Sequence, residues 1–249
     1  MLQSKPLGEK VSVSDRNAIL WQNARDNDWC LECPEIRGTN IVGLIGVIAN
    51  SFTYLYSYAG EKFYKAVVAS TRKSGTVDYI PIIVSERLLD DEFLNNSFFR
   101  KVEISGEYRS RNEWDEKGKS HLALFVFVKS ICEVVDEYVE ENLVFLHGNI
   151  CKKPIIRQTP FGRTITDFLI AVNRKNKKSD YIPCIAWGRT AKFLSECEVG
   201  DEIKLIGRMM SREYTKAISE DDYENRIAYE VSTVLVKLMP NNNRYQEEE

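Results

Sequence analysis

The chain has 249 residues, of which 43% are hydrophobic and 29% charged, and its formal net charge is -3. This is the composition of an ordinary globular protein, at a length that allows one large core or two small ones. No apolar run reaches the roughly 18 residues that cross a bilayer, and the N-terminus lacks the hydrophobic core of a signal peptide. We therefore expect no contact with a membrane and a location in the cytoplasm.

The N-terminal segment, residues 1–36, is expected to be an appendage to the folded part. Ser14 is predicted to cap a short helix over residues 15–24. Cys30 and Cys33 form a Cys-x-x-Cys motif, but further metal ligands at short spacing and the βαβ setting of a redox pair are both missing. The motif is therefore interpreted as incidental, and no metal or other cofactor is expected.

The most regular strand pattern lies between residues 142 and 239, where apolar residues alternate between turns rich in Gly, Pro and charge. A turn containing Pro154, Pro160 and Gly162 follows the first strand, and a short helix over 190–196 separates the third strand from the fourth. Five strands with one helix in that place are the order of an OB-fold, a small Greek-key barrel. The expected strands are 143–150, 165–172, 181–187, 201–210 and 227–238.

Residues 37–133 repeat this pattern in a weaker form. Gly46 corresponds to Gly148, and Tyr79 corresponds to Tyr181, each at an offset of 102 positions. A nearly constant offset of this kind indicates a tandem duplication. Gly148 and the later Gly207 interrupt strand patterns, so we expect them to mark bulges or barrel corners rather than ligand contacts.

The predicted fold class is therefore all-β, with two tandem OB-folds, each a five-stranded Greek-key barrel with a short helix between strands 3 and 4. Residues 134–141 are read as a short acidic linker that keeps the two barrels close together. Residues 240–249 are polar and acidic, and are expected to be a disordered tail.

The two repeats differ at positions that matter for binding. Ser85 stands where the second repeat has Trp187, and Glu113 stands where it has Tyr214, with Trp114 one position later. The first repeat has its own aromatic row, which would lie on one face if the segment is a strand. Either this row binds a ligand or it has turned to packing, and the residues leave both readings open. The row consists of Phe52, Tyr54, Tyr56 and Tyr58.

The second repeat resembles the bacterial single-stranded DNA-binding protein (SSB) family, in segments that keep the order and spacing of that family. The resemblance implies a protein without catalysis that coats single-stranded DNA in replication, recombination or repair. It also implies a homodimer with four OB-folds, and replication or repair proteins as candidate partners. The segments are Asn142-Leu143-Val144 with Gly148, Thr159 to Arg163, Phe168 to Arg174, Asp180 to Gly188, Gly200-Asp201 with Gly207-Arg208, and Ser211 to Tyr214.

A sequence-independent binder of single-stranded DNA needs flat rings for the bases and cations for the phosphates. The resemblance places Tyr181, Trp187 and Tyr214 at the family's stacking positions. Residues 143–214 contain thirteen Lys and Arg against seven Asp and Glu, so the cations are concentrated where binding is expected. The candidate cations are Arg157, Arg163, Arg174, Lys175, Lys177, Lys178, Arg189 and Arg212, and the first repeat adds Tyr79, Arg111 and Trp114.

Two other functions stay open on the residues alone. The barrels would serve protein assembly in a primosome-type interaction module, and the same stacking would serve an RNA-binding OB protein. Strand aromatics are often core residues, and a basic loop is often only solvated. No nucleotide-binding loop or catalytic cluster is present, so we expect no enzyme. The final Glu247-Glu248-Glu249 lacks the apolar tip of the SSB family, so partner recruitment by that route is not expected.

Overall fold

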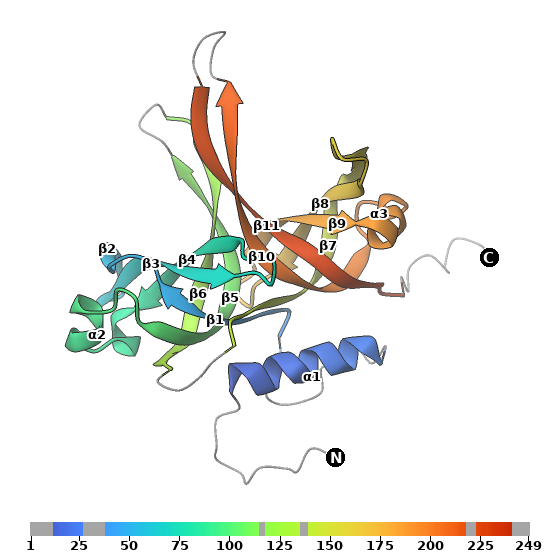
Figure 1. Ribbon diagram of the computed structural model, residues 1–249. Coiled ribbons are helices and arrows are strands. Elements are labelled where there is room, and N and C mark those ends of the chain that lie inside the picture. Colours follow the sequence, from blue (N-terminus) through green and yellow to red (C-terminus); the bar gives the residue numbers. More distant parts are fainter. Residues whose placement is uncertain (1–11, 27–37, 115–117, 135–138, 218–222, 241–249) are drawn as a thin grey trace.

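Two β-barrels make up the computed structural model, which describes residues 12–26, 38–114, 118–134, 139–217 and 223–240 (Figure 1). The Cys30/Cys33 motif, half of the predicted linker (135–138) and most of the predicted tail (241–249) lie outside these ranges. Among the helices described, none has the length and apolar character needed to cross a membrane.

The second barrel shows the predicted five strands with a helix between the third and the fourth, and the first shows the same order with one additional strand, β2, before β3. Each closes through a parallel pair, β4 with β6 and β9 with β11, which is the same connection in each repeat. The all-β prediction of two tandem OB-folds is therefore confirmed. The first barrel contains β1 (Asn40–Ile48), β2 (Thr53–Tyr58), β3 (Glu61–Thr71), β4 (Val77–Ser85), η2 (Glu86–Leu88), α2 (Asp91–Asn95), β5 (Lys101–Trp114) and β6 (Ser120–Glu133); the second contains β7 (Glu141–Gln158), β8 (Thr164–Asn173), β9 (Ser179–Trp187), α3 (Gly188–Ser195), β10 (Glu202–Ala217) and β11 (Tyr223–Leu238).

The prediction of a turn beginning after residue 150 was wrong, because β7 continues to Gln158. Pro154 lies inside this strand, where the pairing with β8 is irregular between Lys152 and Ile155. A bulge removes the need for the backbone N–H that proline lacks. Only the segment that contains Pro160 and Gly162 remains as the turn between β7 and β8.

The predicted aromatic row on β2 does not share one face. The pairing of β2 with β3 shifts between Tyr54 and Tyr56, so that Tyr54 lies opposite Tyr64 and Tyr56 lies opposite Phe63. Because neighbouring residues of β3 point to opposite sides of the sheet, the shift sends the two tyrosines to opposite faces. Phe52, at the start of the row, is buried in the main core.

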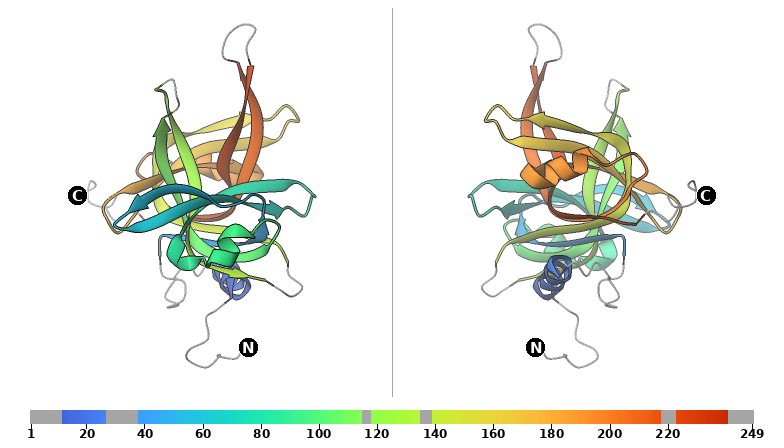
Figure 2. Two further views of the ribbon diagram at one scale, coloured as in Figure 1. Left: turned by 90° about the vertical axis from the view of Figure 1, so that its left-hand side faces the viewer. Right: turned by 90° about the vertical axis from the view of Figure 1, so that its right-hand side faces the viewer.

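The N-terminal helix α1 (Val13–Arg25) packs against the sheet, so this part of the predicted appendage belongs to the fold. Its cap is Ser12 rather than Ser14, with the Ser12 hydroxyl accepting a bond from the Asp15 backbone N–H. Leu20 and Ala24 are buried against apolar side chains of β1, β7 and β10. The helix therefore covers the outer side of the strands that join the barrels, opposite the long hairpins β5–β6 and β10–β11 (Figure 2).

The two barrels are joined into one sheet by antiparallel pairing of β1 with β7, which runs from Asn40 opposite Leu146 to Ile45 opposite Glu141. In this ladder Val42 lies opposite Val144, and these two residues correspond to each other at the repeat offset of 102. The pairing is therefore that of two equivalent strands around a local twofold axis.

Two equivalent asparagines mark the places where β1 and β7 leave the ladders of their own barrels. The Asn40 side chain accepts from the Tyr108 N–H at 2.8 Å and donates to the Tyr108 carbonyl at 2.7 Å. Asn142 makes the same two bonds with the backbone of Met209, both at 2.9 Å. Each amide replaces a missing partner strand, which keeps the buried backbone groups satisfied.

A buried carboxylate of the first barrel is held by the second. Asp78 is fully buried and accepts from Arg72 Nε at 2.8 Å, from Arg208 Nε at 3.1 Å and from the Ser211 N–H at 3.0 Å. The Ser211 hydroxyl in turn accepts from the Tyr79 N–H at 2.8 Å. Burial alone would raise the pKa of Asp78, but the donors, with Arg72 first, outweigh burial and hold that pKa below its ordinary value.

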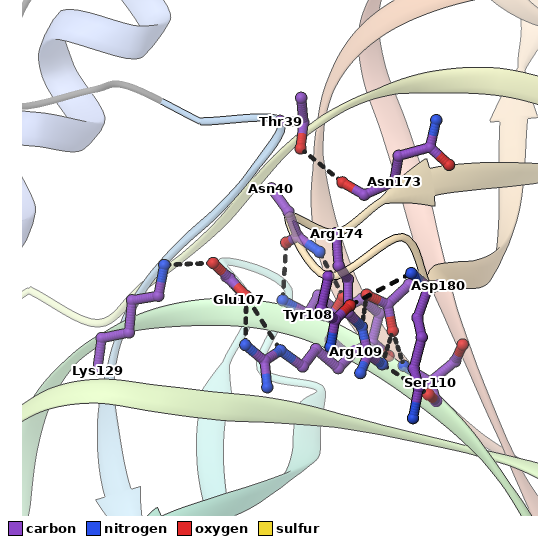
Figure 3. A network of polar contacts seen from close by, with 12 residues as sticks. Thr39, Asn40, Glu107, Tyr108, Arg109, Ser110, Lys129, Asn173, Arg174 and Asp180 are labelled. Atoms are coloured by element: carbon purple, nitrogen blue, oxygen red, sulfur yellow. Dashed lines mark hydrogen bonds and ion pairs between the residues drawn. The ribbon is translucent and has the colours of Figure 1, made fainter.

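The equivalent buried carboxylate of the second barrel, Asp180, is held in the same way by the first barrel (Figure 3). Asp180 accepts from Arg174 Nε at 2.7 Å and from the Ser110 N–H at 2.6 Å. The Ser110 hydroxyl accepts from the Tyr181 N–H at 2.8 Å. Each barrel thus depends on the other to satisfy its buried acid, and this exchange fixes how the two barrels lie.

We expect Gly148→Ala to lower the free energy of unfolding by about 1–3 kcal/mol, the usual cost of overpacking. A Cβ at this position would overlap the Ala171 carbonyl oxygen of β8, so backbone must move. Urea unfolding followed by circular dichroism measures the change. The control Lys153→Ala, at an exposed position of the same strand, should stay within about 0.5 kcal/mol; equal stability of the two variants would contradict the close approach.

The depressed pKa of Asp78 predicts a loss of stability in acid. Its folded-state pKa lies below the ordinary 3.8, so its contribution is complete above that pH and disappears as the pH falls through the folded-state value. Asp78→Asn should cost about 3–5 kcal/mol at pH 7, because two arginines lose their acid. It should also flatten the fall in unfolding free energy below about pH 4, whereas the exposed control Asp91→Asn should keep it.

Candidate nucleic-acid interface

The outer face of the second barrel carries the side chains available for binding. Met210 lies opposite Glu230, Arg212 opposite Ala228 and Tyr214 opposite Arg226 in the β10–β11 pair, and directly opposed residues share a face. On the same side of the barrel, Ile165, Ile185 and Met210 form a small buried cluster. The alternate residues of these strands point inward to the main core, which explains the alternation of the sequence.

A cleft of about 770 Å³ lies where this face meets the first barrel, and we call it the interbarrel cleft. The first barrel supplies Arg72 and Tyr79, and the second supplies Arg157, Trp187, Arg212 and Glu230. Tyr79 and Trp187 are 48% and 39% exposed. Partly exposed rings beside arginines have the surfaces that unpaired bases and phosphates require.

The arginines of the interbarrel cleft differ in how closely they are paired with acidic side chains. Arg157 is ion-paired with Asp167, whereas Arg212 is 3.9 Å from the nearest oxygen of Glu230 and its side chain is 56% exposed. Burial raises the pKa of Glu230, with Arg212 acting against this rise. The cleft therefore combines an available cation with a carboxylate that is poorly solvated.

A second depression, the arm groove, is lined mainly by residues of β6 and β11. These strands belong to the hairpins β5–β6 and β10–β11, which extend on the same side of the molecule (Figure 2). The arm groove consists of two hollows of about 520 and 470 Å³ that share Leu122, Leu124, Ile227 and Tyr229. Tyr214 lines the first hollow, which also shares Glu230 with the interbarrel cleft. The predicted residues Trp187 and Tyr214 thus lie in neighbouring depressions rather than in one.

The equivalent face of the first barrel is packed. Phe63, Ile83 and Phe125 form a buried cluster there. The guanidinium of Arg111 lies 5.4 Å from the centre of the Phe125 ring and is ion-paired with Glu113. Arg111 therefore lines the arm groove while already holding an acidic partner.

Arg174 was predicted to contact phosphate, which requires a free guanidinium on the basic turn, but its guanidinium is not free. Its guanidinium is bound to the buried Asp180 and also donates to the Ser110 carbonyl at 3.0 Å. The structure therefore gives it a role between the barrels. The neighbouring Lys175, Lys177 and Lys178 are exposed.

The remaining predicted residues are exposed but dispersed. Tyr181 is on β9 near the contact with β5, and Trp114 is at the end of the β5 arm. Arg163 lies in the turn between β7 and β8, and Arg189 lies in the first turn of α3. Their DNA contacts stay predictions.

Sequence reasoning missed three residues at this surface. Arg72 corresponds to Arg174 at the offset of 102, a signal that marks it as equivalent, although only the structure shows that it lines the cleft. Phe161 is 92% exposed at the tip of the β7–β8 hairpin and stood inside a segment already singled out. Glu230 had no signal, because it lies in a strand without any motif.

The comparisons with known proteins agree with this architecture. The model of the single-strand binding protein family matches residues 141–236. A single-stranded DNA-binding protein of Thermus thermophilus is 23% identical over 219 residues, which cover 77% of this chain and 82% of that protein. Single-stranded DNA-binding protein 1 of Streptococcus pyogenes is 32% identical over 103 residues, covering 39% of this chain and 79% of that protein.

A solved structure shows the same fold along most of the chain. It is a deletion variant of the single-stranded DNA binding protein from Thermus aquaticus, with a TM-score of 0.66 and 22% sequence identity. The alignment covers 86% of this chain and 99% of that structure. The likeness therefore extends over both barrels, beyond the part that the family model matches.

Proposed function

The chain belongs to the single-strand binding protein family, and from this premise we propose that it binds single-stranded DNA and coats it without turnover. The observation that carries the proposal is the interbarrel cleft, where Tyr79 and Trp187 are partly exposed beside Arg212. The rings would stack on bases of any identity, and the Arg212 guanidinium would contact a phosphate, whereas Arg72 is committed to Asp78 as Arg174 is to Asp180. Such a coat serves replication, recombination or repair.

The path of the strand follows from the two depressions. From the interbarrel cleft it continues past Glu230 and Ile227, which line both, into the arm groove beside Tyr214. The apolar residues Leu122 and Tyr229 in that groove offer further surface for bases. The packed face of the first barrel takes a smaller part, as a wall of the groove.

The proposal includes the homodimer with four OB-folds and the cytoplasmic location that the family resemblance implies. Sedimentation with and without an oligo-dT measures the number of chains in each complex. Competition between dT and rU oligomers decides whether DNA or RNA is the preferred strand, because base stacking alone does not separate them.

Trp187→Ala is expected to weaken binding of a labelled dT oligomer by about 5- to 150-fold. Base–aromatic stacking in proteins of this class is worth about 1–3 kcal/mol per base, a value known for the class and not obtained from the present structure. Fluorescence anisotropy at low salt measures the affinity. Trp187→Phe should keep most of it, and Phe193→Ala, an exposed ring on α3 outside both depressions, should change it less than about twofold.

Arg212→Ala and Arg174→Ala are expected to act differently. Arg212 is available to a phosphate, so its loss should reduce the slope of log affinity against log salt by about 0.7. Arg174 is committed to Asp180, so its loss should leave that slope unchanged but lower the free energy of unfolding by about 3–5 kcal/mol. A reduced slope for both variants would place Arg174 on the DNA instead.

A further inference from the structure

Glu230 is an acid in a cleft that is otherwise rich in arginine. Its side chain is 16% exposed, and its closest cation, Arg212 Nε, is 3.9 Å away, beyond hydrogen-bond distance. Within the described part of the chain, no donor makes a hydrogen bond to its carboxylate. Burial raises the pKa of this group, as expected for a carboxylate that has lost water without gaining a donor.

The position does not require an acid for the fold. Glu230 lies opposite Met210 on β10, and the equivalent residue of the first barrel, opposite Arg109 on β5, is Phe125. Phe125 completes an apolar cluster with Phe63 and Ile83. A carboxylate at this position also repels phosphates, so it weakens the sequence-independent part of DNA binding. Its carboxylate oxygens therefore remain available to a hydrogen-bond donor on a ligand that enters the cleft.

We propose that Glu230 accepts a hydrogen bond from the exocyclic amino group of a base stacked on Trp187, so that this subsite favours cytosine over thymine or uracil. The inference rests on the proposed function and adds a base preference to it. A carboxylate is an acceptor only, and it pairs with the N4 amino group of cytosine. Thymine and uracil present a carbonyl oxygen at the same place, so two sets of lone pairs would face each other.

The pair of oligomers that isolates this contact is oligo-dC against oligo-dU of equal length, because the two bases differ in their edge and not in a methyl group. With the full chain at neutral pH, we expect dC to bind about three- to tenfold tighter than dU. Glu230→Gln should bring the ratio to about one, since an amide can donate to the uracil oxygen as well as accept. The variant should also bind dU more tightly than the wild type does, because a negative charge is gone.

Glu213→Gln is the matched control. Glu213 also lines the interbarrel cleft but is exposed, so its removal changes the same charge without changing a buried acceptor. It should strengthen binding of both oligomers equally and keep the dC preference. A second test uses the wild-type protein and so does not depend on the folding of a variant. An oligomer of N4,N4-dimethyl-deoxycytidine, which lacks the amino hydrogens, should bind the wild type with the affinity of dU.

Three outcomes would each overturn the base preference while leaving single-stranded DNA binding intact. These are equal affinities for dC and dU in the wild type, an unchanged ratio in Glu230→Gln, and binding of the dimethylated oligomer as tight as that of dC. If the wild type bound none of these oligomers, the proposed function itself would fall, and the base preference with it.

Discussion

The antiparallel pairing of β1 with β7 is the constraint on which the rest of the structure depends. It places Val42 opposite its own equivalent, Val144, so the duplicated halves meet around a twofold axis and form one continuous sheet. A contact that the first half makes with the second is therefore repeated by the equivalent residues of the second half with the first. The Ser211 N–H binds Asp78 of the other barrel, and the Ser110 N–H binds Asp180 in the same way.

This arrangement connects stability with binding. The backbone of Tyr79 is held by Ser211 of the other barrel, and Asp78 beside it is neutralised by arginines from both barrels. The interbarrel cleft exists only while the barrels keep this relation, because one barrel supplies Tyr79 and the other Trp187. A change at the buried contact between the barrels is therefore expected to alter the interbarrel cleft, even where the changed side chain does not line the cleft.

Much of the fold was predictable because equivalent residues recur at an almost constant offset and because apolar residues alternate. What failed depended on register. The bulge on β2 separates Tyr54 from Tyr56, and nothing in the alternation of residues 52–58 reveals it. Arg174 reads as part of a basic turn, and only the pairing of β8 with β9 brings it onto Asp180. A cleft between two domains has no signature within either domain, so Glu230 could not be identified from the sequence.

The duplicated halves use one scaffold for different purposes. In the first barrel, Phe63 and Phe125 are buried on the outer face, and burial of aromatic rings is a large stabilising term. In the second, Trp187 stays partly exposed and Glu230 replaces the second phenylalanine, which leaves rings and polar atoms available at a cost in packing. The packed barrel can offset that cost because the two are joined by a shared sheet. The duplication thus separates a packed face in the first barrel from a more exposed face in the second, the one proposed to bind, within a single chain.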